Sequence, residues 1–249
     1  MALILATAWK LVPEHYNFWL DRAGFDRGEE WAKAFSGESA GLKERAAAAL
    51  AALEPMDIPY ISIDPEETLD RDDAFFVEEL PDGGFRAEVA LACPALVWPF
   101  GSSLDKAVLR RASSLYLPEG AEHMLPAAMG WEVFGLDAGK DRPALCVAMR
   151  FGSTGEQLEL RPSLRKVRMG ANLFLGECEG LLVTEESADA GEARNFKPTE
   201  NSLAHAKTLR ASLKLARILQ ARRISLGAVI TERPDPEIVL RKEGGRTLV

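Results

Sequence analysis

Apolar residues recur with two different spacings along the chain, and the change of spacing predicts its elements. In residues 1–53 aromatic and aliphatic anchors are separated by helix-forming residues, and residues 42–53 form an alanine-rich run, so this segment is predicted to be helical. Two prolines within residues 54–60 then end the helical pattern. From Ile61 onward apolar and polar residues alternate in short runs, which is typical of strands.

Glycine, proline and capping residues divide this second part into further elements. The expected elements are strands over 74–77 and 85–92 joined by a turn at 81–84, strands over 144–151 and 157–164 joined by a turn at 152–155, a helix over 103–115 with Ser103 as its N-cap, a helix over 200–223 ended by Gly227, and two final strands around Gly244-Gly245. Helices and strands are mixed without regular alternation, so we predict an α+β fold with a mixed sheet.

Composition sets the class of protein and leaves its chemistry open. The 47% hydrophobic and 27% charged residues exclude a disordered chain. Three cysteines, far apart and odd in number, indicate a reducing compartment, and neither a signal peptide nor a membrane span is recognisable, so we expect a cytoplasmic protein. The net charge of −8 is unusual for a protein that binds nucleic acid, but clustered carboxylates at a metal site would lower it in the same way.

The most informative stretch is the run from Ile63 to Ala74, which holds four aspartates within ten residues: Asp64, Asp70, Asp72 and Asp73. Carboxylates gathered in this way raise one another's pKa unless a cation neutralises them. Oxygen ligands are preferred by Mg²⁺, with Mn²⁺ as an alternative. Two such ions about 4 Å apart can stabilise the attacking and leaving oxygens of a phosphoryl displacement.

The acidic run has three other interpretations, of which the sequence disfavours two. An exposed acidic loop, or aspartates that cap helices, explains composition alone equally well. An EF-hand calcium loop counted from Asp64 fails, since Leu69 stands where glycine is required and Phe75 where glutamate is required. Zinc is disfavoured because no Cys or His pair has ligand spacing.

The spacing of the four aspartates, followed by alanine, resembles the active-site signature of the ribonuclease II family and its RNB catalytic domain. Further segments fit the same family in order, namely Ser103–Ala107, Arg111–Pro118, Met124–Pro126, Arg142–Leu145 and Ala221–Leu240. The resemblance covers about residues 57 to 249. It implies two parts, a helical N-terminal segment over 1–53 and an incomplete, mixed-sheet RNB-type catalytic domain over 54–249.

What the resemblance implies is a hydrolytic 3′→5′ exoribonuclease that releases 5′-mononucleotides from single-stranded RNA, with no DNA and no membrane expected as partners; it gives no oligomeric state. It further implies that Asp64, Asp70 and Asp73 hold Mg²⁺, that loss of Asp72 damages the chemistry most, and that Tyr116 stacks on the terminal nucleotide. Stacking tolerates any base, because every base has a π-face; an ordinary interfacial tyrosine is the alternative for Tyr116.

Two groups of basic residues are secondary candidates for phosphate contacts. One recurs at helical spacing as Lys207, Arg210, Lys214 and Arg217, opposite Leu209, Leu213 and Ala216, and the other comprises Arg161, Arg165, Lys166 and Arg168. A solvated helix face is the favoured interpretation of the first group.

Several departures from the family pattern support a second hypothesis. Cys93 stands where the family usually has aspartate, the arginine-rich motif of the later half of the domain is not found, and neither is an upstream cold-shock domain or a trailing S1 domain. A catalytically inactive RNA-binding or regulatory module is therefore the alternative function. Retention of all four aspartates favours the enzyme.

Overall fold

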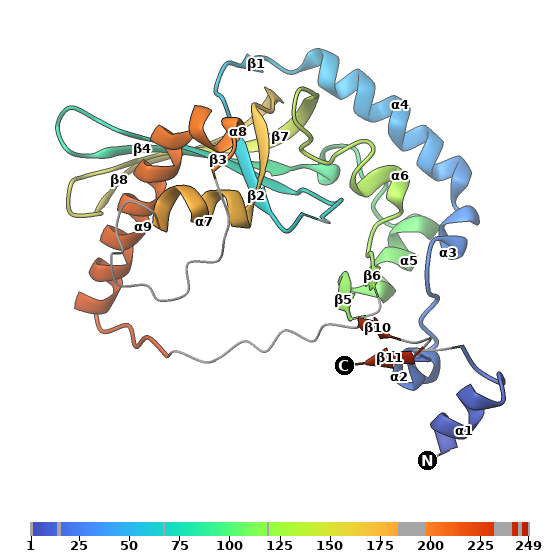
Figure 1. The fold of residues 1–249 in the computed structure, drawn as a ribbon. Helices are drawn as coiled ribbons and strands as arrows, with labels where there is room; N and C mark the ends of the chain where they lie inside the picture. The colour runs from blue at the N-terminus through green and yellow to red at the C-terminus, as the bar shows by residue number, and fades with distance from the viewer. Residues whose placement is uncertain are drawn as a thin grey trace. The chain divides into compact units, whose positions relative to one another are not determined.

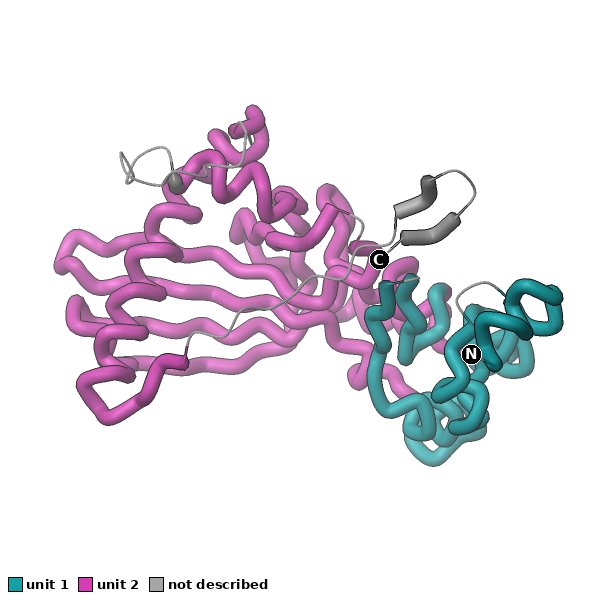
Figure 2. Tube along the Cα trace, turned by 60° about the horizontal axis from the view of Figure 1, so that its bottom comes forward, with its two compact units in different colours: residues 1–40, 99–127, 233–249 teal, residues 41–98, 128–232 magenta. Residues whose placement is uncertain are grey.

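The structure is a computed structural model, and it describes residues 2–13, 16–66, 68–118, 120–183, 198–231, 241–243 and 246–248. The described residues fall into two compact units, coloured separately in Figure 2. Unit 1 draws on Met1–Ala40, Pro99–Ala127 and Arg233–Val249, and unit 2 on Gly41–Trp98 and Ala128–Glu232. The predicted division into 1–53 and 54–249 follows the sequence pattern, whereas the two units are defined by contacts in space. The predicted division therefore stays a prediction.

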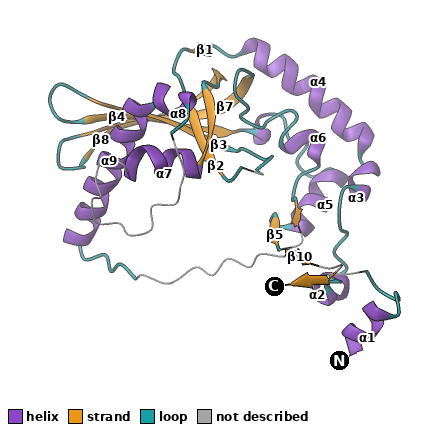
Figure 3. Ribbon diagram, viewed as in Figure 1, coloured by secondary structure: helices purple, strands orange, loops and turns teal. Residues whose placement is uncertain are grey.

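Unit 2 is built on a mixed seven-stranded sheet with the strand order β1-β8-β7-β4-β3-β2-β9 (Figure 1). Two pairs, β1 with β8 and β2 with β9, are parallel, and the other neighbours are antiparallel. The strands are β1 (Pro55–Met56), β2 (Ile61–Asp64), β3 (Asp73–Glu79), β4 (Phe85–Ala92), β7 (Asp141–Phe151), β8 (Gln157–Arg168) and β9 (Ala171–Phe174). The predicted α+β class with a mixed sheet is confirmed (Figure 3).

Both predicted hairpins are present in this sheet. The β3–β4 turn closes with Leu80 N–H donating to the Gly84 carbonyl at 2.8 Å, and Gly83 takes the positive φ of 78° that favours glycine. The β7–β8 turn uses Gly155 at φ 81°. Strands β7 and β8 are each longer than predicted, because their ladder continues to the pair Asp141↔Arg168.

Helices α7 (Leu175–Val183), α8 (Glu200–Ala204) and α9 (Ala206–Ser225) cover one face of the sheet (Figure 1). The predicted helix over 200–223 is thus divided at His205, and Gly227 follows it at φ 96°. Leu209 and Leu215 of α9 are buried against the sheet, whereas Ala216, predicted on the apolar side, is exposed. The apolar side of α9 lies around Leu209, Ala211 and Leu215.

The opposite face of the sheet buries a second apolar core. Tyr60 is its largest fully buried member, and small residues of the central strands pack against it, among them Ala74, Ala90 and Cys146. Alternation along β2 separates the two faces. Ile61 and Ile63 belong to the core under α7 and α9, so Ser62 and Asp64 project from the other face.

Unit 1 consists of short elements. They are α1 (Ala2–Ala8), α2 (Phe18–Arg22), α3 (Glu30–Lys33), α5 (Ser103–Arg111), β5 (Leu115–Leu117), β6 (Gly120–Glu122), β10 (Arg241–Glu243) and β11 (Arg246–Leu248). Helix α4 (Ser36–Ala52) contains the boundary between the units, and α6 (Ala127–Gly130) and a 3-10 turn at Pro94–Leu96 complete the described elements. The helical prediction for residues 1–53 is confirmed for α1 to α4, and the final strand pair is confirmed; its Gly-Gly turn lies outside the described residues.

The helix predicted over 103–115 ends earlier and begins differently. Ser102, not Ser103, is the N-cap, with its Oγ accepting from the Asp105 N–H at 3.2 Å. The helix stops at Arg111 because Ala112 takes a positive φ of 62°, and Leu115 begins β5. In the described part of the chain, no helix has the length and apolar character needed to cross a membrane.

Candidate active site

The four predicted site aspartates lie where β2 ends and β3 begins, in unit 2. Asp64 is the last residue of β2 and Asp73 the first of β3, with Asp70 and Asp72 in the connecting segment. The antiparallel pair Ile61↔Phe75 aligns the two strands, so the end of β2 and the start of β3 lie at the same end of the sheet. Asp72 is held beside β4, since the Ala92 N–H donates to the Asp72 carbonyl at 2.8 Å.

Alternation along β3 separates the carboxylates. Asp73 lies on the same face as Phe75, which packs in the core under α7 and α9, whereas Asp64 follows Ile63 of that core and lies on the other face. Consistent with this, in the described residues no group of three or more His, Cys, Asp and Glu side chains is gathered closely enough to hold a metal ion. The sequence run therefore brings the aspartates to one end of the sheet without converging them on a single point.

Electrostatics nevertheless couple the four carboxylates. Although Asp72 is an exposed residue overall, loss of water around its carboxyl group raises its pKa, and the negative charges of Asp73, Asp70 and Asp64 raise it further. A divalent cation would relieve this repulsion. The donor set thus fits Mg²⁺ in ligand type and charge, and assembly of the ligands would accompany binding.

A cation from the chain itself already lies among these carboxylates. Arg71 Nε is 3.8 Å from Asp64 Oδ2, and Arg71 Nη1 is 3.4 Å from Asp137 Oδ1. The first distance is an ion pair but too long for a hydrogen bond, and Nε is buried without a hydrogen-bond partner. The Leu136 N–H donates to the Arg71 carbonyl at 2.8 Å, which ties this segment to the loop before β7.

Residues around the aspartates that sequence reasoning missed are Ser62, Arg71, Asp137 and Asn172. Ser62 Oγ donates to Asp64 Oδ2 at 2.7 Å, and Asn172 Nδ2 donates to Ser62 Oγ at 2.9 Å. Ser62 could have been found, because it lies two residues before Asp64 on the same strand face. Asn172 carried no such signal, being far away in the sequence.

Cys93 and Tyr116, the other two singled-out residues, lie in different units. Cys93 follows β4 directly after Ala92, whose backbone contacts Asp72, so the cysteine that replaces the usual aspartate is close to the carboxylate segment along the chain. Its thiol is free and partly exposed. Tyr116 is in β5 of unit 1 with 71% of its surface exposed. Its predicted stacking on RNA stays a prediction.

The basic candidates are largely engaged by nearby acids. Lys214 of α9 forms an ion pair with Glu79 of β3. On β8 three arginines are paired with acids, Arg161 with Glu159, Arg165 with Glu54 and Arg168 with Asp141. Alternation along β8 also places Arg161 and Arg165 on one face and Lys166 and Arg168 on the other. These residues form no continuous basic face on β8.

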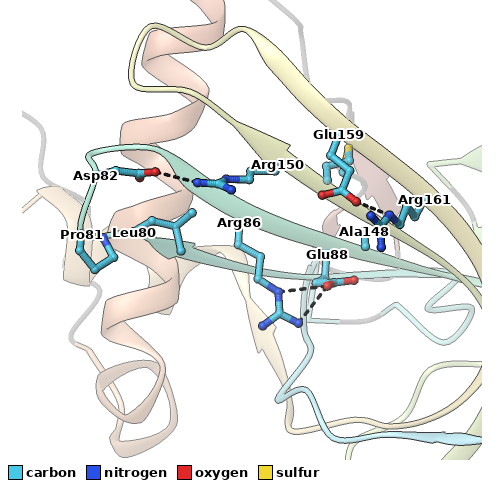
Figure 4. Close-up of a pocket in the computed structure, with 10 residues that line it drawn as sticks. Leu80, Pro81, Asp82, Arg86, Glu88, Ala148, Arg150, Glu159 and Arg161 are labelled. Atoms are coloured by element: carbon cyan, nitrogen blue, oxygen red, sulfur yellow. Dashed lines mark hydrogen bonds and ion pairs between the residues drawn. The ribbon is translucent and has the colours of Figure 1, made fainter.

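A cavity of about 570 Å³ lies elsewhere on the sheet, over the β3–β4 and β7–β8 hairpins. Figure 4 shows its charged residues paired, with Asp82 facing Arg150 and Glu88 facing Arg86, at 2.7 Å and 3.0 Å. Neither the four aspartates nor Tyr116 line it, and the phosphate-contact candidate that does, Arg161, is paired with Glu159. Because its charges already neutralise one another, the carboxylate segment remains the better candidate for catalysis.

The chain is similar in sequence to the RNB domain and to bacterial ribonucleases. The sequence model of the RNB domain matches residues 55–248. Exoribonuclease 2 of Escherichia coli O1:K1 is 31% identical over 193 residues, covering 75% of this chain and 28% of that protein. Ribonuclease R of Aquifex aeolicus is 27% identical over 188 residues, covering 76% of this chain and 25% of that protein.

Solved structures agree at the level of the fold. Mycoplasma genitalium RNase R in complex with ribose methylated single-stranded RNA superimposes with a TM-score of 0.65 at 21% identity, covering 77% of this chain and 28% of that one. Yeast Ssd1, described as a pseudonuclease, gives a TM-score of 0.56 at 19% identity over 72% of this chain and 20% of its own. The chain spans about a quarter of the length of the relatives it matches. It belongs to the RNB domain family.

Proposed function

We propose that the chain carries part of a Mg²⁺-dependent, hydrolytic 3′→5′ exoribonuclease site that releases 5′-mononucleotides from single-stranded RNA. The observation that carries the proposal is the run of four aspartates at the β2–β3 junction of an RNB domain, with the pKa of Asp72 raised first by loss of water around its carboxyl group and then by its carboxylate neighbours. Relatives that cover most of this chain are named Exoribonuclease 2 and Ribonuclease R. Cytoplasmic location belongs to the same proposal, supported by three free cysteines.

In this proposal the residues act in distinct ways. Asp64, Asp70 and Asp73 would hold Mg²⁺, Asp72 would be the carboxylate whose loss damages the chemistry most, and Tyr116 would stack on the terminal nucleotide. When bound, Mg²⁺ supplies Lewis acidity and an activated water for attack on the phosphodiester. Exposure of Tyr116 is compatible with stacking, which is worth about 1–3 kcal/mol per base. Residues 54–249 would form the catalytic part and residues 1–53 an appended helical segment.

The proposal is tested by incubating this chain with 5′-labelled single-stranded RNA and Mg²⁺, alongside Asp72→Asn. We expect progressive shortening from the 3′ end that Asp72→Asn abolishes and that chelation of Mg²⁺ stops. Asp57→Asn, an exposed aspartate outside the run, is the matched control and should act like the parent. Shortening that persists in Asp72→Asn would place the chemistry elsewhere.

A catalytically inactive RNA-binding module is the second candidate. It is favoured by the likeness to a solved pseudonuclease and by Cys93 in place of the usual aspartate. The aspartates are also not gathered into a ready metal site among the described residues. Intact RNA despite measurable RNA binding by the folded chain would support this candidate and reject the enzyme.

A further inference from the structure

Asn172 lies on β9 directly beside Ser62 of β2, because the two strands run parallel in the register Ser62↔Asn172. Its Nδ2 donates to Ser62 Oγ at 2.9 Å and to the Leu136 carbonyl oxygen at 2.8 Å. Its Oδ1 accepts a hydrogen bond from the Ala138 backbone N–H at 2.7 Å. The amide group is therefore engaged at both ends, by partners of different kinds.

These partners fix which way the amide group points. A carbonyl oxygen can only accept and a backbone N–H can only donate, so exchanging Oδ1 and Nδ2 of Asn172 would lose both contacts with residues 136–138. Since Nδ2 donates to Ser62 Oγ, the hydroxyl proton of Ser62 is directed to its other neighbour, Asp64 Oδ2, at 2.7 Å. Ser62 is 2% exposed, so little water competes for this proton.

The Asp64 carboxylate is held at one of its two oxygens. Within the described residues, both contacts made by the Asp64 carboxylate end on Oδ2, one from Ser62 and the longer one from Arg71. Oδ1 is then the oxygen that can turn to a cation. Asn172 also contacts the loop at Leu136 and Ala138, and Leu136 in turn holds the Arg71 backbone.

We propose that Ser62 and Asn172 are positioning residues: together they hold one oxygen of Asp64 and thereby aim the other at the metal ion. This inference rests on the proposed function in assigning a cation to Asp64. Hydrogen-bond partners behind a ligand carboxylate fix its orientation, and losing one typically weakens metal binding about 10–100-fold. Ser62 acts on Asp64 directly, and Asn172 acts through Ser62.

The test is a titration of the full chain with Mn²⁺ in the absence of RNA. Electron paramagnetic resonance of the unbound ion measures how much Mn²⁺ is bound. Ser62→Ala and Asn172→Ala should each weaken Mn²⁺ binding about 10–100-fold. Ser62→Thr keeps the hydroxyl and should bind close to the parent, a rescue that a purely structural role would not require. In RNA degradation the two alanine variants should lower kcat and leave KM nearly unchanged, since RNA contacts are retained.

Control variants and two distinct negative results distinguish failure of the positioning role from failure of the proposed function. Ser163→Ala on β8 and Asn201→Ala on the exposed side of α8 should bind Mn²⁺ like the parent, and amide NMR spectra establish that every variant is folded. If the parent binds Mn²⁺ and folded Ser62→Ala and Asn172→Ala bind it equally well, the positioning role is wrong and the proposed function survives. If the folded parent binds no Mn²⁺, both are wrong.

Discussion

Arg71 places a positive charge beside the carboxylates of Asp64 and Asp137. It stands within the acidic run, lies between Asp64 and Asp137, and has a side chain only 22% exposed. A guanidinium at this place offsets part of the repulsion among carboxylates that would otherwise be uncompensated in the metal-free protein. We infer that Arg71 and a bound divalent ion stabilise the same acidic segment.

Replacing Arg71 with methionine should therefore destabilise the metal-free protein by about 1–2 kcal/mol, between the values for surface and buried ion pairs. Mg²⁺ should then raise the melting temperature of Arg71→Met by more than it raises that of the parent, because the ion replaces the missing charge. Thermal unfolding with and without Mg²⁺ measures both. Arg71→Lys, which keeps the charge, is the control, and equal Mg²⁺ responses in all three proteins would contradict the shared role.

At the scale of elements, the β7–β8 turn is packed against α9. A Cβ built on Gly155 would lie 2.9 Å from Ile218 Cγ2 and 3.4 Å from Leu219 Cδ2, both on α9. Gly155 also has a φ of 81°, which side chains rarely adopt. This glycine lets the tip of a long hairpin approach the helix that covers the sheet.

Gly155→Ala should lower the free energy of unfolding by about 1–3 kcal/mol, combining backbone strain with overpacking against α9. Gly139→Ala separates the two causes, because Gly139 has a similar φ of 73° with nothing within 4 Å of the added Cβ. Urea unfolding of both variants gives the comparison. Equal losses would mean that the contact with α9 contributes nothing.

Sequence reasoning found the elements whose signals are local. Both long hairpins were predicted because glycines mark their turns, and the change of spacing at Ile61 correctly separated helix from strand. Strand β9 and helix α7 were missed, since β9 is only four residues long and joins the sheet as a parallel partner distant in sequence. The aspartates were singled out by their clustering in the sequence together with the resemblance to a family signature, whereas Asn172 is brought near Asp64 only by the β2–β9 pairing.

For the whole molecule, charge distribution matters more than the net value of −8. The basic residues of α9 and β8 that were candidates for phosphate contacts include Lys214, Arg161, Arg165 and Arg168, and each of these four is paired with an acid. An arginine or lysine already neutralised by a neighbour releases few counterions when RNA binds. We expect this chain to track the RNA backbone weakly.

RNA affinity should accordingly fall by less than about tenfold between 50 and 200 mM salt, compared with about 10³–10⁵-fold for proteins that make six to ten phosphate contacts. Fluorescence anisotropy of a labelled single strand across this salt range measures the slope. A steep loss of affinity would show that the ion pairs open to receive phosphates.

The β2–β9 pairing also determines when, during synthesis, Asp64 can acquire its hydrogen-bonded surroundings. The strand that completes the surroundings of Asp64, β9, ends at Phe174 and is synthesised more than a hundred residues later. During synthesis the chain must close a loop of more than a hundred residues before Asn172 can meet Ser62. A nascent chain therefore carries its acidic residues long before this pairing can hold Asp64 in place, and under the proposed function the surroundings of its metal site would be completed only after β9 has been synthesised.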